Sequence, residues 1–168
     1  MIKTYNMKQE YTYWLALANA ENIYTRRKNE ILAKIHEDNS SLAHFFTEEN
    51  NWKSSFDLSQ DEIQSLLQEK EKLNNYSFIV EDLLEQGYQI IPIFSSDYPK
   101  TLKRNLKFSS PILLYAYGNI ELLNKESVAI VGSRNANDTS LNFTDNIASL
   151  SVSDGFVVVS GYAKGVDR

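Results

Sequence analysis

The sequence has no cysteine, two histidines, three prolines and six glycines among its 168 residues. The lack of cysteine excludes disulfides, thiolate metal sites and cysteine nucleophiles, and it is typical of a cytoplasmic protein. Because His36 and His44 have no cysteine beside them, we expect no metal centre. The apolar runs are too short to cross a bilayer, and residues 1–6 lack the pattern of a signal peptide. We therefore expect a cytoplasmic protein with no membrane segment and no cofactor.

What is present suits a folded protein that is not uniformly basic. Hydrophobic residues make up 42% of the chain and aromatic residues 12%, which is enough to build a core. The net charge of −5 argues against a surface designed as a whole for nucleic acid. It leaves room for a local phosphate site, because phosphate binding depends on nearby cations and amides rather than on the total charge.

The first half of the chain has helical patterning. Apolar residues recur at helical spacing through residues 8–75, and one helix is expected over Thr25 to His36. Ser59 stands three residues before Glu62, which is the spacing of a capping box and predicts a helix start. We expect residues 1–75 to form a helical domain.

From Tyr76 onward the pattern changes to α/β. A helix should end at Gly87, and residues 88–94 and 112–117 should be strands. The apolar runs at residues 127–131 and 156–159 flank a helical segment at residues 138–150. Strand, helix and strand at this spacing predict a βαβ unit whose parallel strands prefer cover on both faces. With one crossover helix supplied, we expect an incomplete domain over residues 76–168, with exposed apolar sheet surface.

Two glycine loops follow these apolar strands and carry the chemistry. The first begins at Gly132, Ser133 and Arg134, and the second includes Ser160, Gly161 and Lys164. Both loops should emerge at the carboxyl edge of the sheet, where glycines allow backbone amides to approach an anion. Arg134 adds a forked donor suited to phosphate oxygens. The residues thus indicate a phosphate-bearing ligand, with the alternative that the glycines only end strands and Arg134 faces solvent.

Four motifs occur in order along the second half. They are the segments SDYPKTL at 96–102, PILLYAYG at 111–118, VAIVGSR at 128–134 and VSGYAKGVD at 159–167. Together they closely resemble the DprA/Smf (DNA-processing protein A) family, over residues 86–168. The match over residues 11–85 is one of general helical character.

The resemblance implies a fold and a function. The expected fold is α/β: a SAM-like domain with a degenerate helix-hairpin-helix at residues 1–75, then a truncated extended Rossmann-like sheet at residues 76–168. The implied function is non-enzymatic single-stranded DNA binding in DNA uptake, natural transformation (competence) and recombination, with loading of a RecA-type recombinase by a homodimer. The family places the motif arginine in the DNA pocket, which corresponds to Arg134. The other motif residues implied to line that pocket are Gly132, Ser133, Ser160, Gly161 and Lys164.

Departures from the family pattern shape two further expectations. The stretch at residues 20–24 lacks the glycines of a helix-hairpin-helix turn, so we expect little DNA contact from the helical half, with Arg26, Arg27 and Lys28 as its nearest candidates. A candidate basic patch, flanked by Tyr98 and Phe108, consists of Lys100, Lys103, Arg104 and Lys107, with an ordinary solvated surface as the alternative to a DNA track. The alternative function is a nucleotide-binding phosphoribohydrolase-like enzyme on a related fold.

Overall fold

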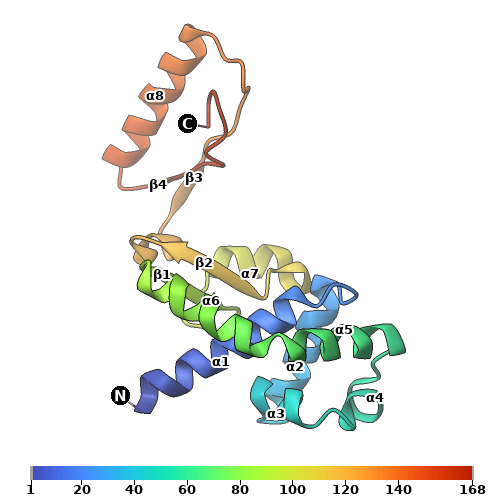
Figure 1. Cartoon of the computed structure of the whole chain (residues 1–168). Coiled ribbons are helices and arrows are strands. Elements are labelled where there is room, and N and C mark those ends of the chain that lie inside the picture. The colour runs from blue at the N-terminus through green and yellow to red at the C-terminus, as the bar shows by residue number, and fades with distance from the viewer. Residues whose placement is uncertain (1, 168) are drawn as a thin grey trace. The chain divides into compact units, whose positions relative to one another are not determined.

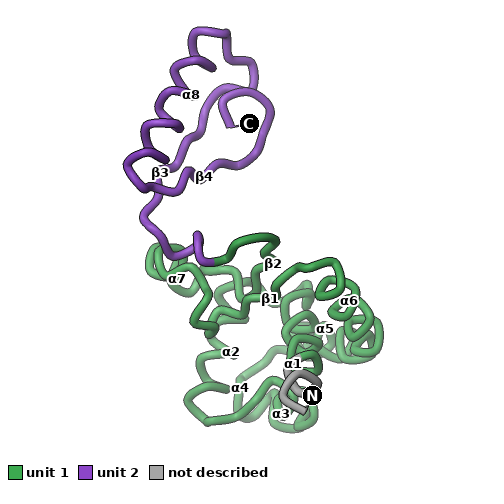
Figure 2. Tube along the Cα trace, turned by 90° about the vertical axis from the view of Figure 1, so that its left-hand side faces the viewer, with its two compact units in different colours: residues 1–120 green, residues 121–168 purple. Residues whose placement is uncertain are grey.

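The computed structural model describes residues 2–167, with side chains described for residues 8–167. The chain divides into two compact units, Met1–Ile120 and Glu121–Arg168, which Figure 2 colours separately. Each unit is considered by itself.

The first unit is mainly helical (Figure 1). Its helices are α1 (Ile2–Asn19), α2 (Thr25–Glu37), α3 (Leu42–Thr47), α4 (Asn51–Phe56), α5 (Gln60–Glu71), α6 (Leu73–Glu85) and α7 (Lys100–Leu106), with a 3-10 turn η1 at Lys107–Ser109. Residues 8–75 form helices joined by short loops, which confirms the prediction of a helical region, and α2 begins at the predicted Thr25.

Local chemistry sets the helix ends. The Ser59 hydroxyl accepts from the Glu62 amide at 3.3 Å, and the Glu62 carboxylate accepts from the Ser59 amide at 2.8 Å. This reciprocal pair is the predicted capping box. At the other end of the helical region, α6 stops before Gly87, whose φ of +85° suits glycine.

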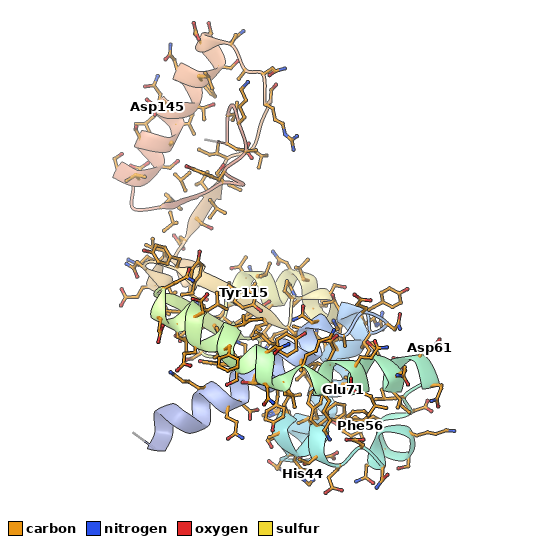
Figure 3. All side chains as sticks on the ribbon, viewed as in Figure 1. His44, Phe56, Asp61, Glu71, Tyr115 and Asp145 are labelled. Atoms are coloured by element: carbon orange, nitrogen blue, oxygen red, sulfur yellow. The ribbon has the colours of Figure 1, made fainter. Side chains whose placement is uncertain are left out.

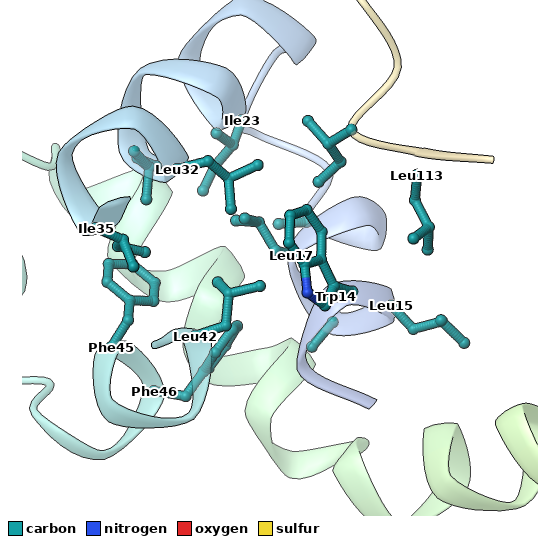
Figure 4. Packing of buried hydrophobic residues seen from close by; sticks show 14 of the residues in the cluster. Trp14, Leu15, Leu17, Ile23, Leu32, Ile35, Leu42, Phe45, Phe46 and Leu113 are labelled. Atoms are coloured by element: carbon teal, nitrogen blue, oxygen red, sulfur yellow. The ribbon is translucent and has the colours of Figure 1, made fainter. Parts of the chain in front are cut away.

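Part of the core of the first unit lies among α1, α2 and α3 (Figure 4), and the same buried cluster extends to α4, α5, α6 and the two strands. Leu15 and Leu17 of α1 are almost fully buried, as are Leu32 of α2 and Phe46 of α3. Trp52 of α4 is fully buried and its indole donates to the Phe45 carbonyl at 2.7 Å, so the one polar atom of that ring is satisfied.

Two strands complete the first unit. β1 (Tyr88–Pro92) pairs antiparallel with β2 (Leu113–Tyr117), with Tyr88 opposite Tyr117. The two strands were predicted, but their pairing was not. α6 packs on α1 and β2 also contacts α1, so compact packing continues past the predicted boundary at residue 75 and the units divide after Ile120. The assignment of residues 76–120 to the DNA-binding domain stays a prediction.

The second unit is a small βαβ element. β3 (Ser127–Ala129) pairs in parallel with β4 (Val157–Val159), and α8 (Asp138–Ser153) connects them and packs on β4. A short 3-10 turn η2 (Ile120–Asn124) precedes β3. The α/β fold class with a short parallel sheet is confirmed.

Burial in the second unit differs from that of a sheet covered on both faces. Val159 is 49% exposed, Leu150 of α8 is 60% exposed, and Val131, just beyond β3, is 76% exposed. Among the described residues a single helix packs against this pair of strands, so much of its apolar surface faces solvent, as expected from one crossover helix. Among residues 2–167, no helix is long and apolar enough to cross a membrane.

Candidate nucleic-acid interface

The loops that follow β3 and β4 lie against each other. Parallel pairing puts both at the carboxyl edge of the strands, and the Ile130 amide extends the ladder by donating to the Val159 carbonyl at 2.9 Å. Further along, the Val166 amide donates to the Ser133 carbonyl at 3.2 Å. Segments about thirty residues apart in the chain therefore form one surface, as the βαβ prediction required.

Glycine is required where the two loops touch. A Cβ on Gly165 would lie 2.2 Å from the Ser133 carbonyl oxygen, and Gly165 also has a φ of +92°. A Cβ on Gly132 would lie 2.7 Å from the side chain of Val166. Both glycines thus permit a close approach of one loop to the other.

Asp167 ties the loops together. Its Oδ1 accepts from the Gly132 amide at 2.9 Å, and its carbonyl accepts from the Ser160 hydroxyl at 2.7 Å. The Gly132 amide, which was expected to face an anionic ligand, therefore donates to a carboxylate of the protein. The Gly161 position lies beside the same carboxylate, since a Cβ there would sit 3.1 Å from Asp167 Oδ2.

The cationic side chains of the two loops remain at the surface. Arg134 and Lys164 are exposed, and so is Ser133, whose Oγ accepts from the Asn135 amide at 3.1 Å. An exposed guanidinium and an exposed ammonium on adjoining loops can both donate to phosphate oxygens. With the Gly132 amide engaged, these side chains are the groups that can meet an anion.

A hollow of about 390 Å³ lies between α8 and the second loop. Its lining includes Asp145, Thr144 and Asp167, of which Figure 3 labels Asp145 on α8. Two carboxylates in the wall disfavour a phosphate inside the hollow. The surface that carries Arg134 and Lys164 is therefore the better anion site.

The candidate basic patch lies on α7 and η1 of the first unit. Arg104 and Lys107 are exposed, while Lys103 donates to the Ile93 carbonyl at 3.0 Å and lies 5.2 Å from the centre of the Phe94 ring. Of the two predicted flanking aromatics, Phe108 is 49% exposed. Tyr98 is 2% exposed with its hydroxyl donating to the Pro111 carbonyl at 2.7 Å, so it belongs to the core and not to the patch.

The basic residues at the start of α2 are committed to the protein. Arg27 donates to the carbonyls of Phe56 and Asp57 at 2.7 and 2.9 Å, and Lys28 donates to the Ala18 carbonyl at 2.6 Å. Arg26 pairs with Glu30 at 3.2 Å. Arg27 and Lys28 thus have carbonyl partners within the protein, and the expectation of little DNA contact from the helical half stays a prediction.

Other hollows and clusters lack features of a phosphate site. A hollow of about 580 Å³ in the first unit has Asp38, His44 and Glu48 in its lining; Figure 3 labels His44. Within residues 2–167 no group of three or more histidine, aspartate or glutamate side chains could hold a metal ion. His36 stacks on the Phe94 ring, with 5.1 Å between ring centres.

Comparisons with known proteins agree with this geometry. The family model for DNA recombination-mediator protein A matches residues 89–168. The DNA processing protein DprA of Bacillus subtilis is 37% identical over 84 residues, which cover 49% of this chain and 28% of that protein. Over these residues the chain resembles the DprA/Smf family. Protein Smf of Synechocystis is 28% identical over 169 residues, covering 94% of this chain and 39% of that protein.

The fold of the chain also matches a solved structure. The X-ray structure of DprA from Streptococcus pneumoniae superposes with a TM-score of 0.68 and 18% sequence identity, covering 93% of this chain and 50% of that one. This likeness shows a shared fold. The chain spans between about a quarter and a half of the length of these relatives.

Two residues at the motif loops were not predicted as site residues from the sequence. Asp167 is the last residue of the fourth motif, and its side chain accepts a hydrogen bond from the first loop. The side chain of Val166 fills the space beside Gly132. The sequence does show a carboxylate two residues after Gly165, but it does not show that this carboxylate binds Gly132, which lies 35 residues away in the chain.

Proposed function

We propose that the surface formed by the two motif loops binds the phosphate backbone of single-stranded DNA, without catalysis. The observation that carries the proposal is the exposure of Arg134 and Lys164 on adjoining loops at the carboxyl edge of a parallel strand pair. Phosphate contacts supply most of the sequence-independent affinity for nucleic acid. Two cations on loops that are hydrogen-bonded to each other suit a ligand with regularly repeated negative charges, such as a phosphate backbone.

The names of the relatives support DNA as the ligand. The family model for DNA recombination-mediator protein A matches residues 89–168, which include both motif loops, and two similar proteins are called DNA processing protein DprA. The proposal therefore includes a role in DNA recombination and natural transformation. It also includes, from the family resemblance, a cytoplasmic location, dimerisation and delivery of DNA to a RecA-type recombinase.

Substituting Arg134 by alanine tests the site. A hydrogen bond to a charged group contributes about 1.5–3 kcal/mol, so Arg134→Ala should weaken oligonucleotide binding by about 10- to 150-fold. The slope of log affinity against log salt should become shallower by about 0.7 for one lost contact on a single strand. Fluorescence anisotropy of labelled oligonucleotides of several sequences, at a series of salt concentrations, measures both quantities.

A matched control lies at the opposite edge of the strands. Lys125 is exposed just before β3, and Lys125→Ala removes the same charge from the same unit. We expect little change in affinity for this variant. Equal affinities and salt slopes for Arg134→Ala and Lys125→Ala, with both proteins folded, would remove Arg134 from the site. Release of free base from a nucleoside monophosphate would instead favour the phosphoribohydrolase-like alternative.

A further inference from the structure

A second basic surface lies on α7 and η1 of the first unit. Residues 100–108 contain four cationic residues and no acidic one, in a chain whose net charge is −5. Arg104, Lys107 and Phe108 are exposed. We call these three residues the α7 surface. A local excess of positive charge on an acidic protein indicates an anionic partner.

The backbone beneath Phe108 is held in place. The buried Asn29 side chain of α2 donates to the carbonyls of Phe108 and Ser110, at 2.9 and 2.8 Å. The ring itself is 49% exposed. A fixed backbone that presents an exposed aromatic ring is a preorganised platform, because little freedom is lost when a flat ligand stacks on it.

Lys107 has an unfavourable backbone conformation for a residue with a side chain. Its φ is 50° and its ψ is −125°, a combination that glycine adopts far more readily. Strained residues persist when the surrounding structure holds them, and they concentrate at functional sites. Lys107 is exposed and directly precedes Phe108 in the chain, and glycine at this position would relieve the strain and remove the charge.

We propose that the α7 surface is a second contact for single-stranded nucleic acid, with a base stacked on Phe108 and neighbouring phosphates bound by Arg104 and Lys107. Alternating flat bases and charged phosphates are the chemistry that an exposed aromatic ring with cations on the same short segment complements. An acidic peptide would match the cations but would leave the exposed ring without a stacking partner. The choice of DNA as the strand rests on the proposed function, whereas the binding surface rests on its own residues.

Lys107→Gly separates binding from folding. Since glycine relieves the positive φ, the variant should have a midpoint temperature equal to or above that of the parent. Its affinity for labelled oligo(dT) should nevertheless fall by about 3- to 10-fold, with a salt slope shallower by about 0.7. A purely structural role for Lys107 would not lower affinity while leaving stability unchanged or improved.

Phe108→Ala tests the stacking platform, and Phe108→Tyr is its conservative match. Stacking of a base on an aromatic ring supports a loss of about 5- to 150-fold for Phe108→Ala and near-parent affinity for Phe108→Tyr. Quenching of a 2-aminopurine placed in the oligonucleotide should accompany binding to the parent and to the tyrosine variant only. Lys125→Ala serves again as the charge-loss control.

The result for the α7 surface is distinguishable from that for the motif loops. If Arg134→Ala has no effect but Lys107→Gly and Phe108→Ala weaken binding, the motif-loop proposal fails and the second contact stands. If both α7 variants bind like the parent, the second contact is overturned whatever Arg134 shows. Binding of poly-glutamate as tight as that of oligo(dT), unaffected by Phe108→Ala, would also overturn it in favour of an acidic protein partner.

Discussion

The buried carboxylate of Glu69 offers a direct test of the packing in the first unit. Glu69 on α5 is 3% exposed. Its carboxylate accepts from the Tyr76 hydroxyl and from the Lys72 ammonium, the latter at 2.7 Å. Lys28 is also buried, and the nearby Glu69 charge partly offsets the burial that lowers the pKa of that ammonium. Replacement of Glu69 by glutamine keeps the shape and removes the charge.

The expected cost follows from the fate of each partner. The side chain of Lys72 is 52% exposed and can be solvated by water, so loss of its ion pair with Glu69 should change the free energy of unfolding little. The Tyr76 hydroxyl keeps an amide oxygen as acceptor but loses a charged hydrogen bond, a difference of about 1–2 kcal/mol. Lys28 loses the compensating charge of Glu69 and keeps, among its described hydrogen bonds, the one to the Ala18 carbonyl. With this loss, Glu69→Gln should lower the free energy of unfolding by about 2–4 kcal/mol in total.

The cost should depend on pH through Lys28. Burial lowers the folded-state pKa of Lys28 below its ordinary value of 10.5, and loss of Glu69 removes the opposing influence. A lowered pKa means that the unfolded state binds more protons over this window, so stability rises as pH increases through the folded-state pKa. The destabilisation by Glu69→Gln should therefore shrink at alkaline pH.

Urea unfolding followed by tryptophan fluorescence gives the measurement. The chain's two tryptophans, Trp14 and Trp52, are both buried in the first unit, so the signal reports that unit. Glu71 is exposed two residues along the same helix and is labelled in Figure 3, and Glu71→Gln should stay within about 0.5 kcal/mol of the parent. Equal midpoints for the two variants would refute the reasoning that the Glu69 cluster stabilises this unit.

Three further outcomes are expected. Ser59→Ala should cost about 0.5–2 kcal/mol in the same urea assay because it removes the α5 cap, and an unchanged midpoint would contradict that role. Burial raises the pKa of Tyr76 and Tyr98 above the ordinary value of 10, and the hydrogen bond and charge of Glu69 raise that of Tyr76 further. The contribution of these two phenols to the free energy of unfolding should therefore be fully present below pH 10 and be lost as pH rises through their folded-state pKa values. Absorbance at 295 nm should show these two phenols ionising only when the protein unfolds. Ionisation of every tyrosine while the protein is still folded would contradict the raised pKa values. Gly165→Ala should displace the second loop and shift the amide resonances of both motif loops, whereas an unchanged NMR spectrum would show that the close approach tolerates a methyl group.

Helix ends could be predicted because their signals are local. The capping pair of Ser59 and Glu62 lies within one turn, and Gly87 stops α6 through its own backbone conformation. The helix α7 was not predicted, because its apolar residues are limited to Leu102 and Leu106 in a basic segment without periodicity over a longer window.

Features that depend on distant partners were not available from the sequence. The antiparallel pairing of β1 with β2 joins Tyr88 to Tyr117, and nothing in either strand specifies the other. The engagement of the Gly132 amide by Asp167 has the same origin, since a loop glycine indicates only that some group approaches closely. Tyr98 was expected at the patch because of its place in the chain, but its hydroxyl donates to the Pro111 carbonyl, thirteen residues away.

The close fit between the two motif loops limits which substitutions and which chimeric proteins can fold. The Gly132 backbone lies against the Val166 side chain, and Gly165 lies against the Ser133 carbonyl, so neither loop can change size alone. Substitutions at these positions should be inherited in compensating pairs. A chimera of two family members should therefore place its breakpoints outside residues 130–167, because a crossover within α8 would join loops that were never selected together.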